Sequence, residues 1–593
     1  MNTDPLTYDA RTIAALLDMA APNIPELEQL RADPGRLLVA PQTGELLEFT
    51  QPLMAHLTPI PQTSYTAYRR FRGDGDRKEY ETAYFAKRQR LAAIALHLFL
   101  GVQSHLPLAD LLNDYVWNIC EESSWVLPAH ERCRIDLFAA ETAFMLADLL
   151  NLMGNRLNAE LRSRLRQEIE QRIFEPYLRF HQLEWWYLGE NNWNGVCNSS
   201  VAAAFVLLEP EPQRLAEALA IAFNSLRHFL NIAFEADGGS NEGVAYWNYG
   251  LINVIALSEL LHARSNGAID LLSSTHMRTI AAYPAKMQLS GSHFAAFSDC
   301  DETLSFQPGI LTRLMQRTGE TSLNNLLVQT IAPREHWRLT MMLRNLTWWD
   351  GTRPEQALLE DAVLPDCGVA RMSSTIADGM PLVVAIKAGH NAENHNQNDI
   401  GSFVVHIDGE NLLTDPGRGL YSRQYFGPQR YDNIFANSYG HSVPRVAGQL
   451  QSPGRQYSGQ LFGITDSEHG KCISVEFAQA YPDKLLHSLH RQICLDEQGQ
   501  MLLSDSFAYS STAIELEEAF ISWLPITLEG NCAHIHGQRH SLKLSIQEPT
   551  GSHFQLEELS QASHENAKTE VLKRLSVQLP LGTERFIMHM EIT

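Results

Sequence analysis

The chain has 593 residues, 44% of them hydrophobic and 19% charged, which is enough to bury a large core and to form roughly two to four domains. Its formal net charge of -23 argues against nucleic acid as a partner, because nonspecific phosphate binding needs a basic surface. The N-terminus has no basic and apolar leader, and no apolar run of membrane-spanning length is expected. We therefore predict a soluble, cytoplasmic protein without a membrane partner, of unknown oligomeric state.

The cysteines form no recognisable redox or metal motif. All eight are scattered without a C-x-x-C pair, and Cys120, Cys197 and Cys472 lie in apolar or mixed surroundings. A chain of this length does not need disulfides to fold, so we expect reduced thiols.

The first 345 residues have a helical pattern. Residues 9–18 begin with a possible cap at Asp9, and a Pro-, Thr- and Gln-rich linker follows over residues 53–65. Apolar residues at three- and four-residue spacing then predict long helices, and Pro284 would kink or end the last of them. A series of such helices without a strand favours a bundle or toroid. The expected helices span residues 84–100, 135–153, 158–174, 212–233, 251–264 and 274–289.

The pattern changes near residues 348–351 to alternating apolar and polar residues, interrupted by turn signals such as Asp408-Gly409. Many short strands without intervening helices favour an antiparallel β-sandwich. The sequence thus predicts an α+β protein with a helical domain over residues 1–345 and a β-domain over residues 346–593. The expected strands span residues 382–387, 403–407, 460–464, 472–478, 487–495, 501–508, 542–546 and 585–592.

One polar stretch lies between two of these strands, at residues 389–403. It reads Gly-His-Asn-Ala-Glu-Asn-His-Asn-Gln-Asn-Asp-Ile-Gly-Ser-Phe. Flanking strands would hold this connection at the rim of a sheet. A solvated loop is the simpler interpretation, but burying so many polar groups would require partners, as in a binding site.

A polar and aromatic cluster covers residues 185–200. Asn191, Asn192 and Asn194 stand beside Trp193 and precede a helix expected over residues 201–208. Aromatic rings beside amides are typical of sugar sites, and a helix N-terminus favours an anion. An asparagine cap over an aromatic core is an equally good interpretation.

Further polar residues come from two other stretches. Residues 237–250 carry Glu242, Tyr246 and Tyr249, and the two tyrosines would share one helical face. Packed aromatics at a turn are the alternative there. Residues 414–441 contribute further candidates for anion or metal binding, namely Asp415, Arg418, Arg423, Arg430 and His441.

Four motifs in order resemble the heparinase II/III-like polysaccharide lyases. They are Asn-Asn-Trp-Asn, Asp-Gly-Gly-x-x-Glu-Gly-x-x-Tyr-Trp, Asn-His-x-x-x-Asp-x-Gly-Ser-Phe and Asp-Pro-Gly. The resemblance extends from about residue 180 to the C-terminus, and the combined order is specific although each motif alone is weak. It implies an (α/α) toroid followed by an antiparallel β-sandwich, and β-elimination at a uronic acid.

This chemistry accounts for the residue types. The C5 proton of a uronate is a poor acid, so hydrogen bonds must neutralise the carboxylate while a base removes the proton. An acid must protonate the leaving glycosidic oxygen. Amides suit the first task, histidine the second, and a tyrosine hydroxyl the third or both.

The resemblance assigns roles to three residues. Asn192 matches the neutralising amide, His395 the histidine of base or charge-neutralising function, and Tyr246 the acid, which could also be the base. Many members carry histidine directly after the amide, where this chain has Trp193. Asn191 and Asn194 are register alternatives for the amide, Tyr249 is the alternative to Tyr246, and His390 could take the place of the missing histidine although its position does not match the family. For substrate binding we predict Trp193, Asn191, Glu242, Tyr249, His390 and Arg430.

The family often binds a divalent metal in its β-domain, and the matching positions here are Gln397, Asp415 and His441. The first is usually histidine, so zinc is less favoured and a harder ion such as manganese or calcium becomes plausible. We expect a structural metal that supports the loop of His395. A hydrogen-bonded trio without metal is the alternative.

The sequence leaves several functions open. The first is a lyase acting on glycosaminoglycans or their oligosaccharides, with an anionic saccharide as the partner; alginate or oligo-alginate is an alternative substrate. A glycoside hydrolase would instead need two carboxylates, for which Glu190, Asp237 and Glu242 are candidates. A carbohydrate-binding protein with a degenerate site is the third possibility.

Overall fold

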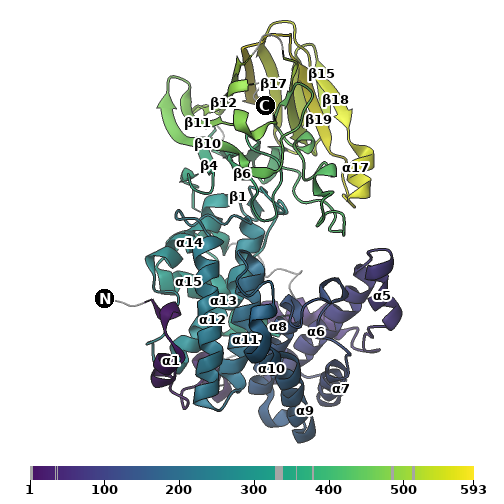
Figure 1. Ribbon diagram of the computed structural model, residues 1–593, viewed down its shortest axis with the longest axis vertical. Coiled ribbons are helices and arrows are strands. Elements are labelled where there is room, and N and C mark those ends of the chain that lie inside the picture. The colour runs from purple at the N-terminus through teal and green to yellow at the C-terminus, as the bar shows by residue number, and fades with distance from the viewer. Residues whose placement is uncertain are drawn as a thin grey trace. The chain divides into compact units, whose positions relative to one another are not determined.

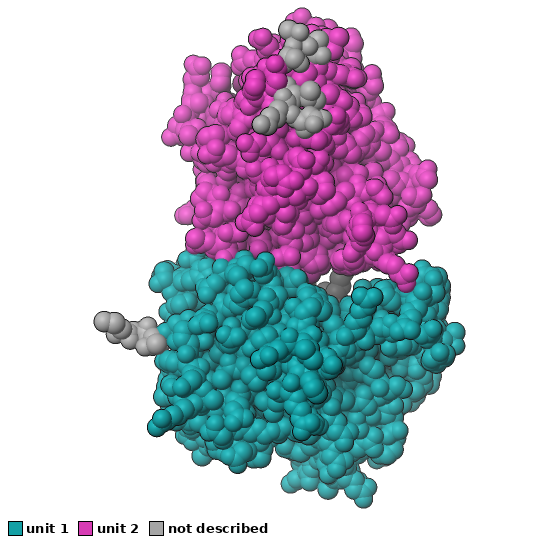
Figure 2. Space-filling view, in the orientation of Figure 1, with its two compact units in different colours: residues 1–233, 247–281, 305–355 teal, residues 234–246, 282–304, 356–593 magenta. Residues whose placement is uncertain are grey.

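The computed structural model describes residues 4–33, 35, 38–327, 338–354, 357–376, 379–482, 486–510 and 514–593. Two compact units divide the chain, and both are discontinuous in sequence (Figure 2). The helical unit comprises residues 1–233, 247–281 and 305–355, and the β unit comprises residues 234–246, 282–304 and 356–593. The units interleave, whereas the sequence interpretation placed a single boundary between residues 345 and 346.

The helical unit is an (α/α) toroid built from helices of very different length (Figure 1). Two helices, α13 and α14, cross a boundary between the units. The helices are α1 (Ala10–Leu16), α2 (Pro25–Ala32), α4 (Pro41–Met54), α5 (Tyr65–Gly73), α6 (Lys78–Leu100), α7 (Leu108–Cys120), α8 (Leu137–Met153), α9 (Ala159–Ile169), α10 (Glu175–Phe180), α11 (Asn192–Leu208), α12 (Pro212–Ile232), α13 (Val244–Arg264), α14 (Thr275–Met287), α15 (Pro308–Thr318) and α16 (Leu339–Trp348).

Helix α8 is buried on nearly all sides, and α11 packs against it. Its two buried acids are paired, because Glu141 accepts a hydrogen bond from Arg338 Nε at 2.9 Å and Asp148 one from Arg344. By length and composition the stretch Leu137–Arg156 could span a membrane, which corrects the expectation that no such run exists. Since 83% of that apolar window is buried inside the protein, it has the character of a core helix.

One expectation about a helix start needs correction. Helix α11 begins at Asn192, nine residues before the expected start, and the Asn191 side chain caps it by accepting from Trp193 N at 3.2 Å. Asn192 and Asn194 therefore lie inside the helix. Helix α14 continues through Pro284 to Met287.

The β unit contains three larger antiparallel sheets and one short two-stranded sheet. The nine-stranded sheet has the order β15-β16-β17-β20-β13-β12-β11-β10-β6, the five-stranded sheet β3-β4-β5-β7-β8, and the four-stranded sheet β18-β19-β14-β9. The strands are β1 (Gln288–Ser290), β2 (His293–Phe294), β3 (Ala362–Leu364), β4 (Val369–Thr375), β5 (Pro381–Lys387), β6 (Gly389–Asn391), β7 (Phe403–Ile407), β8 (Glu410–Leu413), β9 (Arg445–Val446), β10 (Gly454–Ser467), β11 (Gly470–Glu476), β12 (Leu486–Leu495), β13 (Gln500–Tyr509), β14 (Leu516–Ser522), β15 (Ile526–Glu529), β16 (Cys532–His536), β17 (Ser541–Glu548), β18 (Gln555–Glu558), β19 (Lys573–Gln578) and β20 (Arg585–Ile592), with one helix, α17 (Ser560–Glu565).

The predicted fold class, a helical toroid followed by an antiparallel β-sandwich, is confirmed. Each expected strand corresponds to one of β5, β7, β10, β11, β12, β13, β17 and β20. The short pair β1–β2 lies in the part of the chain where the sequence indicated helices alone, and it belongs to the β unit.

A buried arginine lies in the sandwich core and holds two loops that matter below. Arg491 pairs with Asp505 at 2.6 Å and with Glu518 at 3.1 Å. Its Nη1 also donates to the carbonyls of Gly401 and Ser442, at 2.8 and 2.6 Å. One charge, fully paired, thus ties the loop before β7 to the loop that follows His441.

The expectation of reduced thiols is wrong for two cysteines. Cys472 on β11 and Cys494 on β12 are direct cross-strand partners with their Cα atoms 4.0 Å apart, and they form a disulfide. No local pattern indicates this bond, because strand register decides which residues face each other.

Candidate active site

His395 lies in the loop that leaves β6, at the edge of the nine-stranded sheet, and enters β7 inside the five-stranded sheet. Its backbone φ is +56°, an uncommon conformation for a residue other than glycine. Backbone strain of this kind is often found at functional sites, where the surrounding structure maintains it. The contacts of the His395 side chain support that interpretation.

Asp299 is the carboxylate partner of His395. Its Oδ2 accepts a hydrogen bond from His395 Nδ1 at 3.0 Å, and its Oδ1 accepts from Tyr425 Oη at 2.7 Å and from Arg430 Nη2 at 2.9 Å. The side chain of Asp299 is fully buried. The imidazole is therefore held through Nδ1, which leaves Nε2 to face other groups.

Several charges and hydrogen bonds determine the ionisation of Asp299. Burial alone would raise its pKa, but the hydrogen bond from His395 and the positive charge of Arg430 outweigh burial and lower the pKa below its usual value. Asp299 is thus a fixed negative charge behind the imidazole.

The Tyr246 ring stacks on the His395 imidazole. Its ring centroid lies 3.8 Å from that of His395, with 16° between the planes. Tyr246 Oη and Tyr421 Oη form a 2.5 Å hydrogen bond, and Tyr421 Oη lies 3.5 Å from Asp299 Oδ2. Burial raises the pKa of Tyr246 well above its usual range, so the hydroxyl is protonated and can act as a proton donor.

Glu242 and Arg430, both predicted for substrate binding, also contact this cluster. Glu242 Oε1 lies 3.7 Å from His395 Nε2. Arg430 donates to the carbonyl of Asn396 as well as to Asp299. Its guanidinium is therefore paired within the protein. We call the group of His395, Asp299, Tyr246, Tyr421 and Glu242 the His395 cluster; all five belong to the β unit.

The predicted residues of the helical unit have their own surroundings. Asn192 is buried and lies close to Gly250 of α13. A Cβ atom added to Gly250 would lie 3.5 Å from the Cα of Asn192. The Trp193 ring lies edge-on to His130, 4.7 Å between centroids. Tyr249 Oη donates to Glu141 at 3.2 Å, so the Tyr249 hydroxyl is engaged there and not with Tyr246.

His390 has a different environment from His395, although the two are close in sequence. It lies in β6, paired with Ser458 of β10, and its Nδ1 accepts from the backbone of Ala392. Among the described contacts none joins it to the His395 cluster. Arg418 pairs with Asp301 at 3.3 Å and stacks on the Tyr421 ring, which places a cation beside the cluster.

The predicted metal ligands form a second, fully buried group. Ligand atoms of Asp399, Asp415 and His441 all lie within 4.8 Å of one another. Asp399 was not among the predicted ligands. Gln397 lies nearby: its Nε2 donates to the carbonyl of Gly417, and the Gly417 N–H donates to Asp415. We call these four residues the Asp415 group.

Unpaired polar atoms concentrate in the Asp415 group. Within the described residues, Gln397 Oε1, Asp399 Oδ2, Asp415 Oδ2 and both His441 nitrogens are buried without a hydrogen-bond partner, although His441 Nδ1 lies 3.3 Å from Asp415 Oδ2. The other carboxylate oxygen of Asp399 accepts from Lys387 Nζ at 2.7 Å. Buried polar atoms are normally paired, and each orphan is costly. Carboxylate and amide oxygens close to an imidazole are a ligand set that a divalent cation can use.

The remaining carboxylate candidates for hydrolysis are less suitable. Asp237 accepts from the backbone N–H groups of Gly239, Asp366 and Cys367, so it supports a loop.

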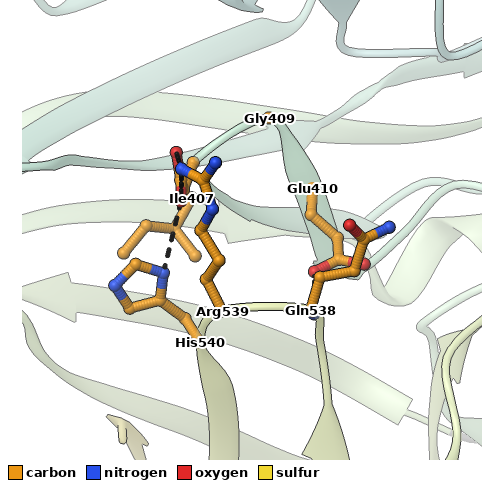
Figure 3. A pocket seen from close by; sticks show the side chains of 7 residues that line it. Ile407, Gly409, Glu410, Gln538, Arg539 and His540 are labelled. Atoms are coloured by element: carbon orange, nitrogen blue, oxygen red, sulfur yellow. Dashed lines mark hydrogen bonds and ion pairs between the residues drawn. The ribbon is translucent and has the colours of Figure 1, made fainter.

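A surface pocket of about 250 Å³ lies at the β7–β8 turn, where Asp408 pairs with Arg539 (Figure 3). It shares no lining residue with the His395 cluster.

The sequence interpretation missed Asp299 and Asp399, and gave no role to Tyr421. Asp399 could have been found, because it is the Asp of the Asn-His-x-x-x-Asp motif. Asp299 follows a stretch with a helical pattern, and only the fold brings it to His395. Tyr421 stood in a polar stretch already noted, but nothing in its spacing indicated a contact with Tyr246.

The fold and site define a protein with a helical toroid, an antiparallel β-sandwich, and a histidine that is held by a buried carboxylate and stacked on tyrosine. Residues 357–570 match the family described as Heparinase II/III-like, C-terminal. This match covers the larger part of the β-domain, and the resemblance expected from the motifs is confirmed there.

Solved structures agree with this fold. A structure of Heparinase III shares 12% identity with a TM-score of 0.62, covering 98% of this chain and 93% of that one. A mutant of the heparan sulfate lyase HepC from Pedobacter heparinus shares 12% identity with a TM-score of 0.60, covering 93% and 82%. No curated protein matches the chain by sequence.

Proposed function

We propose that this protein is a polysaccharide lyase that cleaves uronate-containing glycosaminoglycans, or oligosaccharides derived from them, by β-elimination. The observation that carries the proposal is the Tyr246 ring stacked 3.8 Å from His395, whose Nδ1 is held by buried Asp299. A general base and a general acid in contact are what removal of a C5 proton and protonation of a leaving oxygen require.

In the proposed reaction, His395 Nε2 takes the C5 proton, because Asp299 fixes the proton of the neutral ring on Nδ1. The C5–H electron pair forms the C4–C5 double bond, and the C4–O bond breaks. Tyr246 gives its proton to the leaving glycosidic oxygen and regains one through the hydroxyl of Tyr421. Neutralising the uronate carboxylate lowers the barrier to proton removal, and the Asn192 amide of the helical unit is our candidate for that role.

We propose that the Asp415 group binds a divalent metal through Asp399, Asp415, His441 and the Oε1 of Gln397. The five buried atoms of this group that lack a hydrogen-bond partner support the assignment. When bound, the metal would supply positive charge that holds together the segments of Gln397 and Asp399, of Asp415, and of His441. Its role is structural, since the proposed proton transfers use His395, Tyr246 and Tyr421.

The test is a panel of heparan sulfate, chondroitin sulfate, hyaluronan and alginate, followed by ultraviolet absorbance and product mass. Elimination creates a conjugated double bond, so absorbance rises with each cleavage, whereas hydrolysis releases reducing ends without that rise. Activity should be lost in Tyr246→Phe and His395→Ala and kept in Tyr65→Phe, which changes a tyrosine that is 76% exposed. No absorbance rise on any of the four polymers would refute the proposal.

A further inference from the structure

A short segment of the helical unit displays large apolar side chains to solvent. Between residues 180 and 188, four such side chains are exposed: Phe180 at 39%, Leu183 at 67%, Trp185 at 56% and Leu188 at 52%. Single exposed apolar residues are ordinary, but a contiguous group usually marks a binding surface. The segment directly precedes Asn191 and Asn192.

The backbone of this segment is firmly anchored. Trp186 is fully buried and donates through its indole to the carbonyl of Ile135 at 2.8 Å, and Tyr187 Oη donates to the carbonyl of Ile221 at 3.2 Å. Trp185 therefore faces outward from a fixed backbone. A ring held in place before binding loses little conformational freedom when a ligand stacks on it.

Trp185 continues a row of aromatic rings. Its centroid lies 4.9 Å from that of Trp193, which in turn lies 4.7 Å from that of His130. Asp136 Oδ2 lies 2.9 Å from His130 Nδ1, which fixes the imidazole beside Trp193. The row thus leads from an exposed indole to the residue next to Asn192.

Two arginines lie near Trp185 in a chain of net charge -23. Trp185 lies beside Cys133, whose neighbours Arg132 and Arg134 are both exposed, and Arg134 is loosely paired with Glu184 at 3.9 Å. The Arg134 guanidinium lies over the Phe180 ring at 5.1 Å. Flat apolar rings with adjacent cations suit a sugar ring that carries carboxylate or sulfate groups.

We propose that Trp185, with Trp193 and flanked by Arg132 and Arg134, forms a subsite of the helical unit that binds a sugar ring of an acidic oligosaccharide. This inference rests on the proposed function for the identity of the sugar, an acidic oligosaccharide. It predicts that affinity increases when the substrate is lengthened from a disaccharide to a tetrasaccharide, and that Trp185 provides the increase.

The test compares Trp185→Ala with Trp117→Ala, a matched control because Trp117 is a 51% exposed tryptophan of the same unit on α7. Heparan sulfate disaccharide and tetrasaccharide are titrated calorimetrically into each variant in a Tyr246→Phe background. The Kd for the tetrasaccharide should rise on the order of tenfold in Trp185→Ala and remain unchanged in Trp117→Ala. Trp185→Phe should recover part of the loss.

Initial rates of otherwise unmodified protein separate the two proposals. If the protein cleaves the tetrasaccharide and both alanine variants bind it equally, the subsite is refuted and the lyase assignment stands. If it binds through Trp185 without cleavage, the subsite stands and the lyase assignment falls. Concentration-dependent self-association that Trp185→Ala abolishes, with no change in saccharide affinity, would assign the surface to a second copy of the chain and refute the subsite.

Discussion

Replacing Asp299 with asparagine is the most direct test of the His395 cluster. The carboxylate accepts from His395, Tyr425 and Arg430 at 3.0, 2.7 and 2.9 Å, and an amide cannot accept from all three because one of its two polar atoms is a donor. Asp299→Asn therefore removes both a charge and at least one acceptor. His395 would no longer be restricted to one tautomer.

The magnitudes follow from the burial of these groups. Breaking a buried ion pair typically costs about 3–5 kcal/mol. Arg430 is 12% exposed and keeps its bonds to the Asn396 carbonyl, so we expect a loss of about 2–3 kcal/mol in the free energy of unfolding. For the reaction, loss of the fixed tautomer should lower kcat by about 10²- to 10⁴-fold, as in other histidine–carboxylate pairs.

The pH dependence gives a second readout. Because the folded-state pKa of Asp299 lies below its usual value, its stabilising contribution is present above that usual value and disappears as the pH falls through the folded pKa. The stability difference between wild type and Asp299→Asn should accordingly shrink on acidification below about pH 4.

The assay combines initial rates over a range of pH with thermal unfolding. Asp466→Asn, which changes an exposed aspartate on β10 of the same unit, serves as the control. Wild-type kcat with an unchanged pH profile in Asp299→Asn would refute the idea that Asp299 positions His395. A drop in stability with normal kcat would show that the carboxylate is structural only.

Three further predictions concern the β unit. His441→Ala should remove bound metal measured by atomic emission, and a chelator should destabilise wild type by about 3 kcal/mol if metal is present at 100 times its Kd, but leave His441→Ala unaffected. Burial raises the pKa of Glu393 to about 7, so the folded state retains a proton that the unfolded chain releases above pH ~4.5. Wild type should therefore lose stability relative to Glu393→Gln between pH ~5 and ~7. Parallel plots of the free energy of unfolding against pH for the two proteins would disprove this. Cys472→Ser should lower the free energy of unfolding by about 3 kcal/mol, because it opens a bond between residues 22 apart in sequence. If all eight cysteines of the wild-type protein are alkylated after unfolding without reductant, the protein is reduced and the disulfide is absent.

The sequence predicted elements whose signal is local. Strand β7 alternates little and is buried throughout, yet its β-branched residues between a polar loop and Asp408-Gly409 sufficed to place it. Strands β14 and β19 carry charged residues that the fold buries or partly buries, and no local pattern predicted these strands. Glu517 pairs with Arg574 of the same sheet, and Glu518 pairs with Arg491 on β12 of the nine-stranded sheet. Such pairing does not appear in a local pattern.

The same distinction applies to the site. Tyr246 and His395 could be named because each lies in a motif of its own. Their contact, and the third partner Asp299, depend on three segments that are far apart in sequence. Gln397 illustrates the opposite case: its motif position suggested a ligand, and its buried, unpaired Oε1 is compatible with that role.

The interleaved course of the chain has a consequence for inheritance and engineering. The His395 cluster draws Glu242 and Tyr246 from residues 234–246, Asp299 from residues 282–304, and the rest from beyond residue 356. The region that matches the family, residues 357–570, thus contains the histidine but neither its carboxylate nor the stacked tyrosine. Recombination at a single crossover would separate these parts. Residues 357–570 therefore cannot be exchanged as one segment that carries the whole His395 cluster.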